Sequence, residues 1–474
     1  MLVKRFFDEP LAQTSYLIGC GATGTAIVID PNRLVDPYIG AAEAEGLRIT
    51  AVTETHIHAD FLSGTRELAA RTGAPMYLSA MGPADWQYEF RNEPNARPLH
   101  HAGVITVGNV SIEAVHTPGH TPEHLSFLVT DGAVADEPMA IVTGDFVFVG
   151  DVGRPDLLEK AARIAGTSEH AARDLYRSLD WFRSLADHIQ VWPGHGAGSA
   201  CGKGMSAVPQ STVGYERRYN WAFGATSEAE FVRQVLVGQP EPPRYFGVMK
   251  RINREGPPLL GSLPNPERVA EHRLLDLLAE GATVIDTRAT AEFAAGHLPG
   301  SLNIPLGNNF TTYAGSLLPY DRDLYLILQS GVPHAVRRAV QMLVTIGLDR
   351  VAGYAGSEAL SVWSAEGREL ERTPQTAAAD VPARQRAGAL VVDVRARSEW
   401  DQGHIEGARL IPLPELVDRL GEIPEGQEVL LHCQGGGRSA VAASLLLASG
   451  RKHVANVSGG FGAWIKAGLP ESQS

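Results

Sequence analysis

In the first half of the chain, short apolar runs alternate with stretches in helical spacing, a pattern typical of layered α/β folds. Four apolar runs have the pattern of buried strands: RITAVT, VSIEAV, MAIVTG and HIQVWPG. Each run leads into a polar residue, in order His56, His120, Asp145 and His195. Loops at strand ends gather side chains into sites in such folds. We therefore expect these four residues to converge.

The second half contains an internal repeat. Residues 284–306 read VIDTRATAEFAAGHLPGSLNIPL, and residues 391–413 read VVDVRARSEWDQGHIEGARLIPL. Each copy continues with an apolar run, a turn and a segment in helical spacing. The second half is therefore expected to hold two small α/β units.

Two segments divide the chain. Prolines crowd residues 239–266 and disfavour continuous helix there, and residues 372–382, RTPQTAAADVP, have the composition of an exposed linker. We expect an α/β protein of three domains, at 1–258, 259–375 and 376–474, in line with roughly 150 residues per domain.

Composition narrows the function classes. Apolar residues are 44% and charged residues 20%, which excludes a disordered chain and a membrane bundle. The net charge is −13 with scattered Lys and Arg, so nucleic acid is not an expected partner. Asp8, Glu9 and Pro10 interrupt the N-terminal apolar run, and no stretch of about 18 apolar residues follows. We expect a cytoplasmic protein without a membrane partner.

The segment Thr55–Asp60 predicts a metal site. His56, His58 and Asp60 occupy alternate positions, which face one way on an extended segment. Further nitrogen and oxygen donors follow at His120, Asp145 and His195. Such donors bind zinc or iron.

Over about the first 250 residues, this motif set resembles the metallo-β-lactamase fold, a four-layer αβ/βα sandwich with HxHxD, H, D and H ligands at one sheet edge. Binuclear hydrolases of that fold, such as glyoxalase II, mostly continue HxHxD with another histidine. Phe61 stands there instead, and a phenyl ring cannot coordinate, which favours a mononuclear site. The segments ETHIHADFLSG and HTPGHTPEHLSF look most like those of persulfide dioxygenases.

That resemblance implies one Fe(II) per chain, held by His56, His120 and Asp145, with positions open for a substrate sulfur and O₂. The same resemblance makes His58, Asp60 and His195 groups that orient the ligands. The implied reaction oxidises a low-molecular-weight thiol persulfide with O₂ to sulfite. A binuclear zinc hydrolase would instead use His58 and His195 as ligands, and the sequence leaves that alternative open.

The three cysteines, Cys20, Cys201 and Cys433, are too few and too far apart for a disulfide framework. Cys201 lies among glycines in GHGAGSACGKG, where Lys203 favours a thiolate. Because fused persulfide dioxygenases carry a similar segment, we expect Cys201 to hold or relay sulfur near the metal; the alternative is an inert buried cysteine. Cys20 is expected only to pack.

The second repeat places a glycine-rich loop between a strand and a helix. The loop consists of Cys433, Gln434, Gly435, Gly436, Gly437, Arg438 and Ser439. Inward N–H groups and the positive end of the following helix favour a thiolate. Together with DVR, GHIEGA and SGGFGAW, the loop resembles that of rhodanese sulfurtransferases, which closes around a persulfide; a phosphatase-like CX5R loop would need one more residue.

The first repeat departs from this pattern. Alignment of the two copies sets Leu328 opposite Cys433, while Pro333 replaces the arginine and His334 the serine. The loop QSGVPH has neither a nucleophile nor three glycines. We therefore expect a rhodanese-like domain without sulfurtransferase activity, retained for packing, docking or substrate positioning.

The leading hypothesis is a sulfide-detoxifying enzyme that forms sulfite at iron and thiosulfate at Cys433. The alternative is a zinc-dependent thioester hydrolase fused to a sulfurtransferase. A sulfur-carrying scaffold without catalysis would need no metal, and the His56, His120 and Asp145 set argues against it. The carrier thiol and any association of copies into a homo-oligomer stay open.

Overall fold

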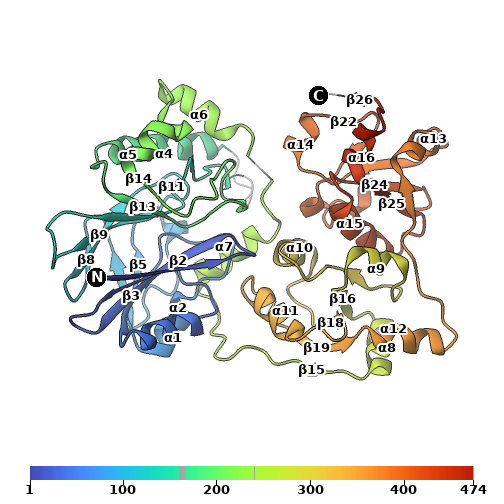
Figure 1. Ribbon diagram of the computed structural model, residues 1–474, viewed down its shortest axis with the longest axis horizontal. Coiled ribbons are helices and arrows are strands. Elements are labelled where there is room, and N and C mark those ends of the chain that lie inside the picture. The colour runs from blue at the N-terminus through green and yellow to red at the C-terminus, as the bar shows by residue number, and fades with distance from the viewer. Residues whose placement is uncertain (158, 160–165, 240, 473–474) are drawn as a thin grey trace. The chain divides into compact units, whose positions relative to one another are not determined.

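Strand-forming runs of the first half build two mixed six-stranded sheets (Figure 1). The structure is a computed structural model and describes residues 1–157, 159, 166–239 and 241–472. The first sheet has the order β1 to β6, antiparallel up to β3 and parallel from β3 onward. Its strands are β1 (Leu2–Asp8), β2 (Gln13–Cys20), β3 (Thr25–Ile29), β4 (Arg48–Thr53), β5 (Met76–Ser79) and β6 (Ala96–Leu99).

The second sheet has the order β14-β13-β10-β9-β8-β7, with β10 and β13 parallel and the other pairs antiparallel. Its strands are β7 (Val104–Val107), β8 (Val110–His116), β9 (Leu125–Asp131), β10 (Ala140–Gly144), β13 (Gln190–Pro193) and β14 (Ser211–Thr212). A hairpin of β11 (Val147–Phe148) and β12 (Asp151–Val152) lies beside it.

Helices cover the outer faces of both sheets (Figure 1). The helices are α1 (Asp36–Ala44) and α2 (Thr65–Thr72) on the first sheet, and α4 (Ser168–Arg183), α5 (Val213–Tyr219) and α6 (Glu228–Leu236) on the second. Between the sheets, apolar side chains such as Ile18, Ile27, Phe127 and Val142 form a buried core. The result is a four-layer αβ/βα sandwich, which confirms the fold class expected for this half.

The second half forms two parallel five-stranded sheets, as predicted from the repeat. The first contains β15 (Glu267–Arg268), β16 (Thr283–Asp286), β17 (Leu302–Asn303), β18 (Leu324–Leu328) and β19 (Val351–Gly356). The second contains β20 (Gln375–Ala377), β21 (Leu390–Asp393), β23 (Arg409–Leu410), β24 (Val429–His432) and β25 (Val454–Ser458).

Helices accompany each parallel sheet (Figure 1). In the first copy they are α8 (Glu271–Ala279), α9 (Thr290–Ala295), α10 (Phe310–Leu317), α11 (Ala335–Val344) and α12 (Glu358–Ala365). In the second copy they are α13 (Val381–Arg386), α14 (Arg397–Asp401), α15 (Gly437–Ala448) and α16 (Gly460–Lys466), and a short pair joins β22 (His404–Ile405) to β26 (Glu471–Ser472).

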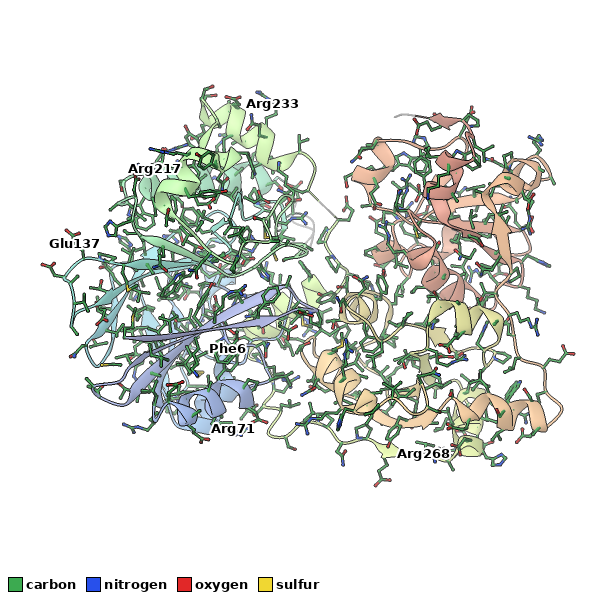
Figure 2. All side chains as sticks on the ribbon, in the orientation of Figure 1. Phe6, Arg71, Glu137, Arg217, Arg233 and Arg268 are labelled. Atoms are coloured by element: carbon green, nitrogen blue, oxygen red, sulfur yellow. The ribbon has the colours of Figure 1, made fainter. Side chains whose placement is uncertain are left out.

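By contacts, the described chain divides into two units: Met1–Ser262 with Thr345–Gly347, and Leu263–Val344 with Leu348–Ser474. Charged side chains such as Arg71, Glu137 and Arg217 project from the surface of the first unit (Figure 2). Among the described residues, no helix has the length and apolar character needed to cross a membrane.

The two proposed linkers are more ordered than their composition indicates. Helix α7 (Phe246–Glu255) forms inside the proline-rich segment, in a stretch that itself contains no proline. In the second segment, β20 adds to the last sheet by pairing with β25, and Thr376 is buried. The segment 372–382 is therefore an ordered part of the last sheet although many of its residues are exposed, because part of it pairs with a distant strand through the backbone.

Candidate functional site

The polar residues predicted at strand ends do lie at strand ends. His56 follows β4, His120 follows β8, Asp145 directly follows β10 and His195 follows β13. The backbone N–H of Gly194 donates to Gly144 O (2.9 Å), which ties the ends of β13 and β10 together. The two sheets thus bring these four side chains to one edge of the sandwich.

The structure brings the three predicted metal ligands together. Donor atoms of His56, His120 and Asp145 all lie within 4.8 Å of one another, in a fully buried group. Asp145 Oδ2 is 3.5 Å from His120 Nε2 and 4.0 Å from His56 Nε2. His56 Nε2 and both Asp145 carboxylate oxygens are buried without a hydrogen-bond partner in the described chain. Such orphaned donors fit a bound metal ion.

The far ring nitrogens of the histidines are held by hydrogen bonds that leave Nε2 free to coordinate. His120 Nδ1 donates to Arg154 O (3.1 Å), and His195 Nδ1 donates to Ala12 O (3.0 Å). Burial, and then the neighbouring imidazoles, lower the pKa of His56 well below its usual value. A neutral imidazole oriented in this way has its lone pair available to a metal.

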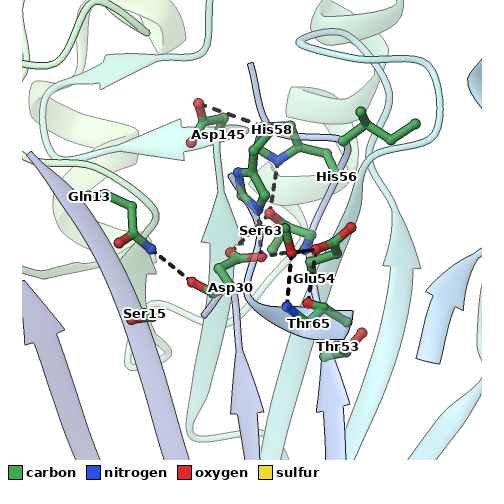
Figure 3. Close-up of polar contacts among 12 residues, drawn as sticks. Gln13, Ser15, Asp30, Thr53, Glu54, His56, His58, Ser63, Thr65 and Asp145 are labelled. Atoms are coloured by element: carbon green, nitrogen blue, oxygen red, sulfur yellow. Dashed lines mark hydrogen bonds and ion pairs between the residues drawn. The ribbon is translucent and has the colours of Figure 1, made fainter. Parts of the chain in front are cut away.

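His58 lies outside this donor group: Asp30 holds its Nε2 (Figure 3), and its Nδ1 is buried without a hydrogen-bond partner among the described residues. His58 Nε2 donates to Asp30 Oδ1 at 3.1 Å, and the ring of Phe61 lies 4.4 Å from the ring of His58. Burial acts to lower the pKa of His58, but the Asp30 and Glu54 carboxylates outweigh it and raise this pKa to about 9. In this arrangement His58 is a charged partner of Asp30.

Asp30 is a residue that sequence reasoning missed. Besides the hydrogen bond from His58, its carboxylate accepts hydrogen bonds from Thr55 N (2.6 Å) and Thr55 Oγ1 (3.0 Å). Thr55 Oγ1 in turn accepts a hydrogen bond from His56 Nδ1 (2.9 Å), which links Asp30 to His56. The backbone of Asp30 is at φ +54°, an uncommon conformation for a residue with a side chain. Asp30 directly follows β3, so the same strand-end criterion would have found it.

A second donor group lies on the other side of Asp145. Donor atoms of Asp60, His195 and Cys201 lie within 4.8 Å of one another, and all three residues are buried. His195 Nε2 is 3.2 Å from Asp60 Oδ2 and 3.5 Å from Asp145 Oδ1. The structure therefore places the three residues together.

The expected effect of Lys203 on Cys201 is wrong. Lys203 Nζ donates to Gln234 O and Val237 O and lies 4.3 Å from the ring of Trp221. Burial, followed by the nearby Asp145 and Asp60 carboxylates, raises the pKa of the Cys201 thiol well above its ordinary value. Without a bound cation, Cys201 is therefore a thiol. Cys20 packs in the core between the sheets, with Asn109 N donating to its Sγ (3.4 Å).

The cysteine loop follows β24 and leads directly into α15. Cys433 is buried, and Gly436 N donates to its Sγ at 3.1 Å while Ser439 Oγ lies 3.5 Å from the same sulfur. Gly436 has φ +97°, a left-handed conformation that favours glycine. The loop thus directs hydrogen-bond donors and the N-terminus of α15 at the Cys433 sulfur.

Glu399 holds the arginine of this loop, and sequence reasoning missed it. Arg438 Nη1 and Nη2 donate to Glu399 Oε2 (2.6 Å) and Oε1 (2.7 Å), a bidentate pair. Burial acts to raise the pKa of Glu399, but the hydrogen bonds from Arg438 and from Ala396 N outweigh it and lower this pKa. Glu399 also caps α14 through Ala396 N (3.0 Å).

A cavity of about 580 Å³ opens over the loop. Its lining includes Gly435, Gly436 and Gly437 of the loop, together with Thr290 and Ala294 of α9 in the first repeat. Asn303 N in the first repeat donates to Ser444 Oγ on α15 (3.0 Å), which ties the two copies together. The copy that lacks a cysteine therefore supplies part of the cavity beside the glycines of the Cys433 loop.

Family models match both halves of the chain. The model for the metallo-beta-lactamase superfamily matches residues 8–195, and the model for the rhodanese-like domain matches residues 271–364 and 377–467. A crystal structure described as a metallo-beta-lactamase from Staphylococcus aureus subsp. aureus COL is 44% identical, covers 75% of this chain and 99% of its own, and has a TM-score of 0.69.

Two other relatives match smaller shares of the chain. A hydroxyacylglutathione hydrolase from Rhodospirillum rubrum is 29% identical over 180 residues, which are 38% of this chain and 60% of that protein. The chain thus spans less than two thirds of that hydrolase. The crystal structure of ETHE1 from Myxococcus xanthus is 26% identical and covers 54% of this chain and 98% of its own, with a TM-score of 0.44.

Proposed function

The chain belongs to the metallo-β-lactamase superfamily and carries two rhodanese-like domains, and we propose that it oxidises a low-molecular-weight thiol persulfide with O₂ and passes sulfur through Cys433. The observation that carries the proposal is the first donor group. It contains two histidines and one carboxylate, whose donor atoms all lie within 4.8 Å of one another. This ligand set is that of non-haem Fe(II) oxygenases.

One iron per chain at His56, His120 and Asp145 would supply open positions for the substrate sulfur and for O₂. In the overall reaction, persulfide, O₂ and one water give the free thiol, sulfite and two protons. We assign His195 and Asp60 the role of orienting the ligands: His195 Nε2 lies 3.5 Å from Asp145 Oδ1 and 3.2 Å from Asp60 Oδ2. The buried surroundings of these residues exclude bulk water from the reacting sulfur.

At the second site, the Cys433 thiolate would attack the outer sulfur of a persulfide and release the carrier thiolate. Sulfite would then attack the outer sulfur of the Cys433 persulfide, forming the S–S bond of thiosulfate and restoring the Cys433 thiolate. Gly436 N and the start of α15 stabilise negative charge on sulfur in both steps. The neutral cavity walls, with Thr290 and Ala294, leave room for a thiol larger than thiosulfate.

Metal content and O₂ uptake test the first half of the proposal. Protein purified without oxygen should hold about one iron per chain and consume O₂ when a thiol persulfide is added. His120→Ala and Asp145→Ala should lose both iron and O₂ uptake, while sulfur transfer from thiosulfate to a thiol continues at Cys433. Two tightly bound zinc ions in an active preparation would overturn the iron assignment.

The product ratio tests the coupling of the two sites. With persulfide and O₂, the intact protein should release mainly thiosulfate, whereas Cys433→Ser should release mainly sulfite. Products must be counted early and with little excess persulfide, because sulfite also reacts with persulfide without an enzyme. An unchanged ratio in Cys433→Ser would show that Cys433 does not process the product of the metal site.

The second candidate function is a zinc-dependent thioester hydrolase fused to a sulfurtransferase. The position of Asp145 between two donor groups favours it, and so does the similarity to the hydrolase from R. rubrum. This alternative requires hydrolysis of a hydroxyacyl thioester of glutathione by the zinc-loaded protein, without O₂ uptake. The dioxygenase proposal requires O₂ uptake and no hydrolysis of the thioester.

A further inference from the structure

We propose that Asn253 is a positioning residue for the metal ligands: from helix α7 it fixes the loop that carries His56, and so sets the geometry of the first donor group. The proposal rests on the metal-binding role of that group, but not on which metal it holds or on the reaction proposed above.

The loop between β4 and α2 has no regular structure of its own. Residues 54–64 contain neither a helix nor a strand, and their one isolated bridge joins Ser63 to Asn32. All of them except Ala59 are buried. Buried backbone N–H and C=O groups need hydrogen-bond partners, so side chains from elsewhere in the chain must provide them.

Asn253 provides three of these partners. Its Nδ2 donates to His58 O (2.8 Å) and to Phe61 O (2.7 Å), and its Oδ1 accepts from Ser63 N (2.9 Å). The side chain is buried, with 1% of its surface exposed. An amide can donate to two carbonyl oxygens and accept from an N–H group at once, whereas an ionised carboxylate has no hydrogen to donate.

The upstream end of the loop is held by two carboxylates. Asp30 accepts from Thr55 N (2.6 Å), and Glu123 accepts from Ile57 N (2.8 Å), so each neighbour of His56 has one fixed amide. The asparagine of α7 fixes the downstream end. Because its contacts begin two residues after His56, release of this end would loosen the backbone that carries the ligand.

A series of hydrogen bonds links the α7 amide to the ligand ring. Asn253 holds the backbone of His58, and His58 Nε2 donates to Asp30 Oδ1 (3.1 Å). Asp30 accepts from Thr55 Oγ1 (3.0 Å), and that oxygen accepts from His56 Nδ1 (2.9 Å). A displacement of the loop at His58 is therefore passed to the imidazole of His56, whose Nε2 faces the donor group.

Helix α7 is itself fixed to the first unit. Glu89 N donates to Arg254 O (2.8 Å), and Arg254 Nη2 donates to the Glu89 carboxylate (2.9 Å). Just beyond the helix, Arg66 Nη1 on α2 donates to Pro257 O (2.9 Å). The side chain of Asn253 is therefore presented to the loop from an anchored helix, as the positioning of a site requires.

The change Asn253→Asp separates these contacts from the packing of the helix. It keeps the size of the side chain and the oxygen that accepts from Ser63 N, but replaces the donating group by an oxygen that repels two carbonyl oxygens. We expect the loop to shift and the first donor group to lose its arrangement. Loss of a contact that orients metal ligands typically weakens metal binding by about 10- to 100-fold.

Co²⁺ binding by the full-length protein tests the proposal, because the visible absorption of Co²⁺ depends on the arrangement of its ligands. At less than one Co²⁺ per chain and without oxygen, Asn253→Asp should bind Co²⁺ about 10- to 100-fold more weakly than wild type, with shifted absorption bands. Competition with a chelator of known affinity measures the binding. The matched control Arg254→Gln removes the ion pair of the next residue with Glu89, leaves the contacts of Asn253 in place, and should keep both affinity and absorption.

Two results would overturn the role of Asn253. One is wild-type affinity and absorption in Asn253→Asp, and the other is an equal change in Arg254→Gln, which would show that any loosening of α7 has this effect. If Asn253→Asp does not fold, Asn253→Ala takes its place, with the same loss expected because all three contacts are removed. Wild-type protein that binds no Co²⁺ would instead overturn the metal centre of the proposed function, and this inference with it, so the two failures are distinguishable.

Discussion

The two rhodanese-like copies share the framework of their sheets and differ in one loop. In each copy, an aspartate at the end of a central strand pairs with a buried arginine: Asp286 with Arg288 (2.6 Å) and Asp393 with Arg395 (2.7 Å). Each copy also caps its next helix with a glutamate, Glu292 or Glu399. The framework is thus maintained by contacts outside the loop, so a copy can lose its nucleophile and still fold.

The two loops present different groups to a ligand. In the second copy, Gly436 N points at the sulfur of Cys433. In the first copy, Leu328 is buried at the strand end, and the carboxylate of Glu358 accepts from Ser330 Oγ (2.7 Å) at the edge of a cavity of about 290 Å³. That hydrogen bond lowers the pKa of Glu358, so a negative charge lines the first cavity, and Arg268 lines the same cavity with a positive charge.

Removal of the nucleophile gives the largest expected difference between the copies. Cys433→Ser should lower sulfur transfer from thiosulfate to a thiol by about 10³-fold or more, because a hydroxyl at this position is a far weaker nucleophile than a thiolate. The matched change Leu328→Ser should leave the rate within about twofold of wild type. Steady-state assays of both variants measure the contrast; full transfer by Cys433→Ser would refute the role of the loop.

Glu399 and Glu292 test a second difference between the copies, which is the arginine found only in the Cys433 loop. Glu399→Gln should lower sulfur transfer about tenfold, because it removes the bidentate partner of Arg438, and a hydrogen bond to a charged group contributes roughly 1.5–3 kcal/mol. Glu292→Gln, in the copy that has Pro333 instead of arginine, should not change the rate. The pH dependence of the rate distinguishes the positioning of Arg438 by Glu399 from a general loss of structure. In wild type, protonation of Glu399 at acid pH should lower the rate of sulfur transfer, and Glu399→Gln should lack this fall. Equal effects of the two variants would mean that Glu399 acts only as a helix cap.

The free energy of unfolding of Glu399→Gln should differ from that of wild type in a pH-dependent way. The pKa of Glu399 is lower in the folded protein than its usual value of about 4.3, so its contribution is complete above that pH and is lost as the pH falls through the folded pKa. The free energy of unfolding of wild type should exceed that of Glu399→Gln by at most about 1 kcal/mol at pH 6, since the pair is part exposed. Denaturant titrations should show this excess shrinking towards pH 3. A gap that widens in acid would contradict the assignment.

Restoring a cysteine gives the smallest expected effect. Leu328→Cys should add no measurable sulfur transfer to a Cys433→Ser background, because Pro333 has no guanidinium and the Glu358 carboxylate lies at the cavity. Adding Glu358→Gln to this variant tests the effect of the carboxylate separately. It should raise the rate at which a neutral reagent alkylates the introduced thiol more than it raises the rate of sulfur transfer. Substantial transfer by Leu328→Cys alone would show that the nucleophile is the only difference between the copies.

Local sequence patterns were sufficient to predict the α/β layers, the repeat and the positions of the polar residues at strand ends. These follow from local rules, because apolar periodicity identifies strands and the residue after a strand lies at a sheet edge. The same rules located Cys433 between β24 and α15, and identified Leu328 at the corresponding position of the first copy.

Which groups contact one another at those edges could be seen only in the folded chain. Asp30 binds His58, Glu399 binds Arg438, and Cys201 lies beside Asp60, although each pair is separated in the sequence. Local periodicity carries no information on such distances, because they depend on how two sheets pack and on which loops the buried ionic pairs fix. For the same reason the nearness of Lys203 to Cys201 in sequence was misleading: its ammonium group is satisfied by carbonyl oxygens at the end of α6, and the thiol is left among carboxylates.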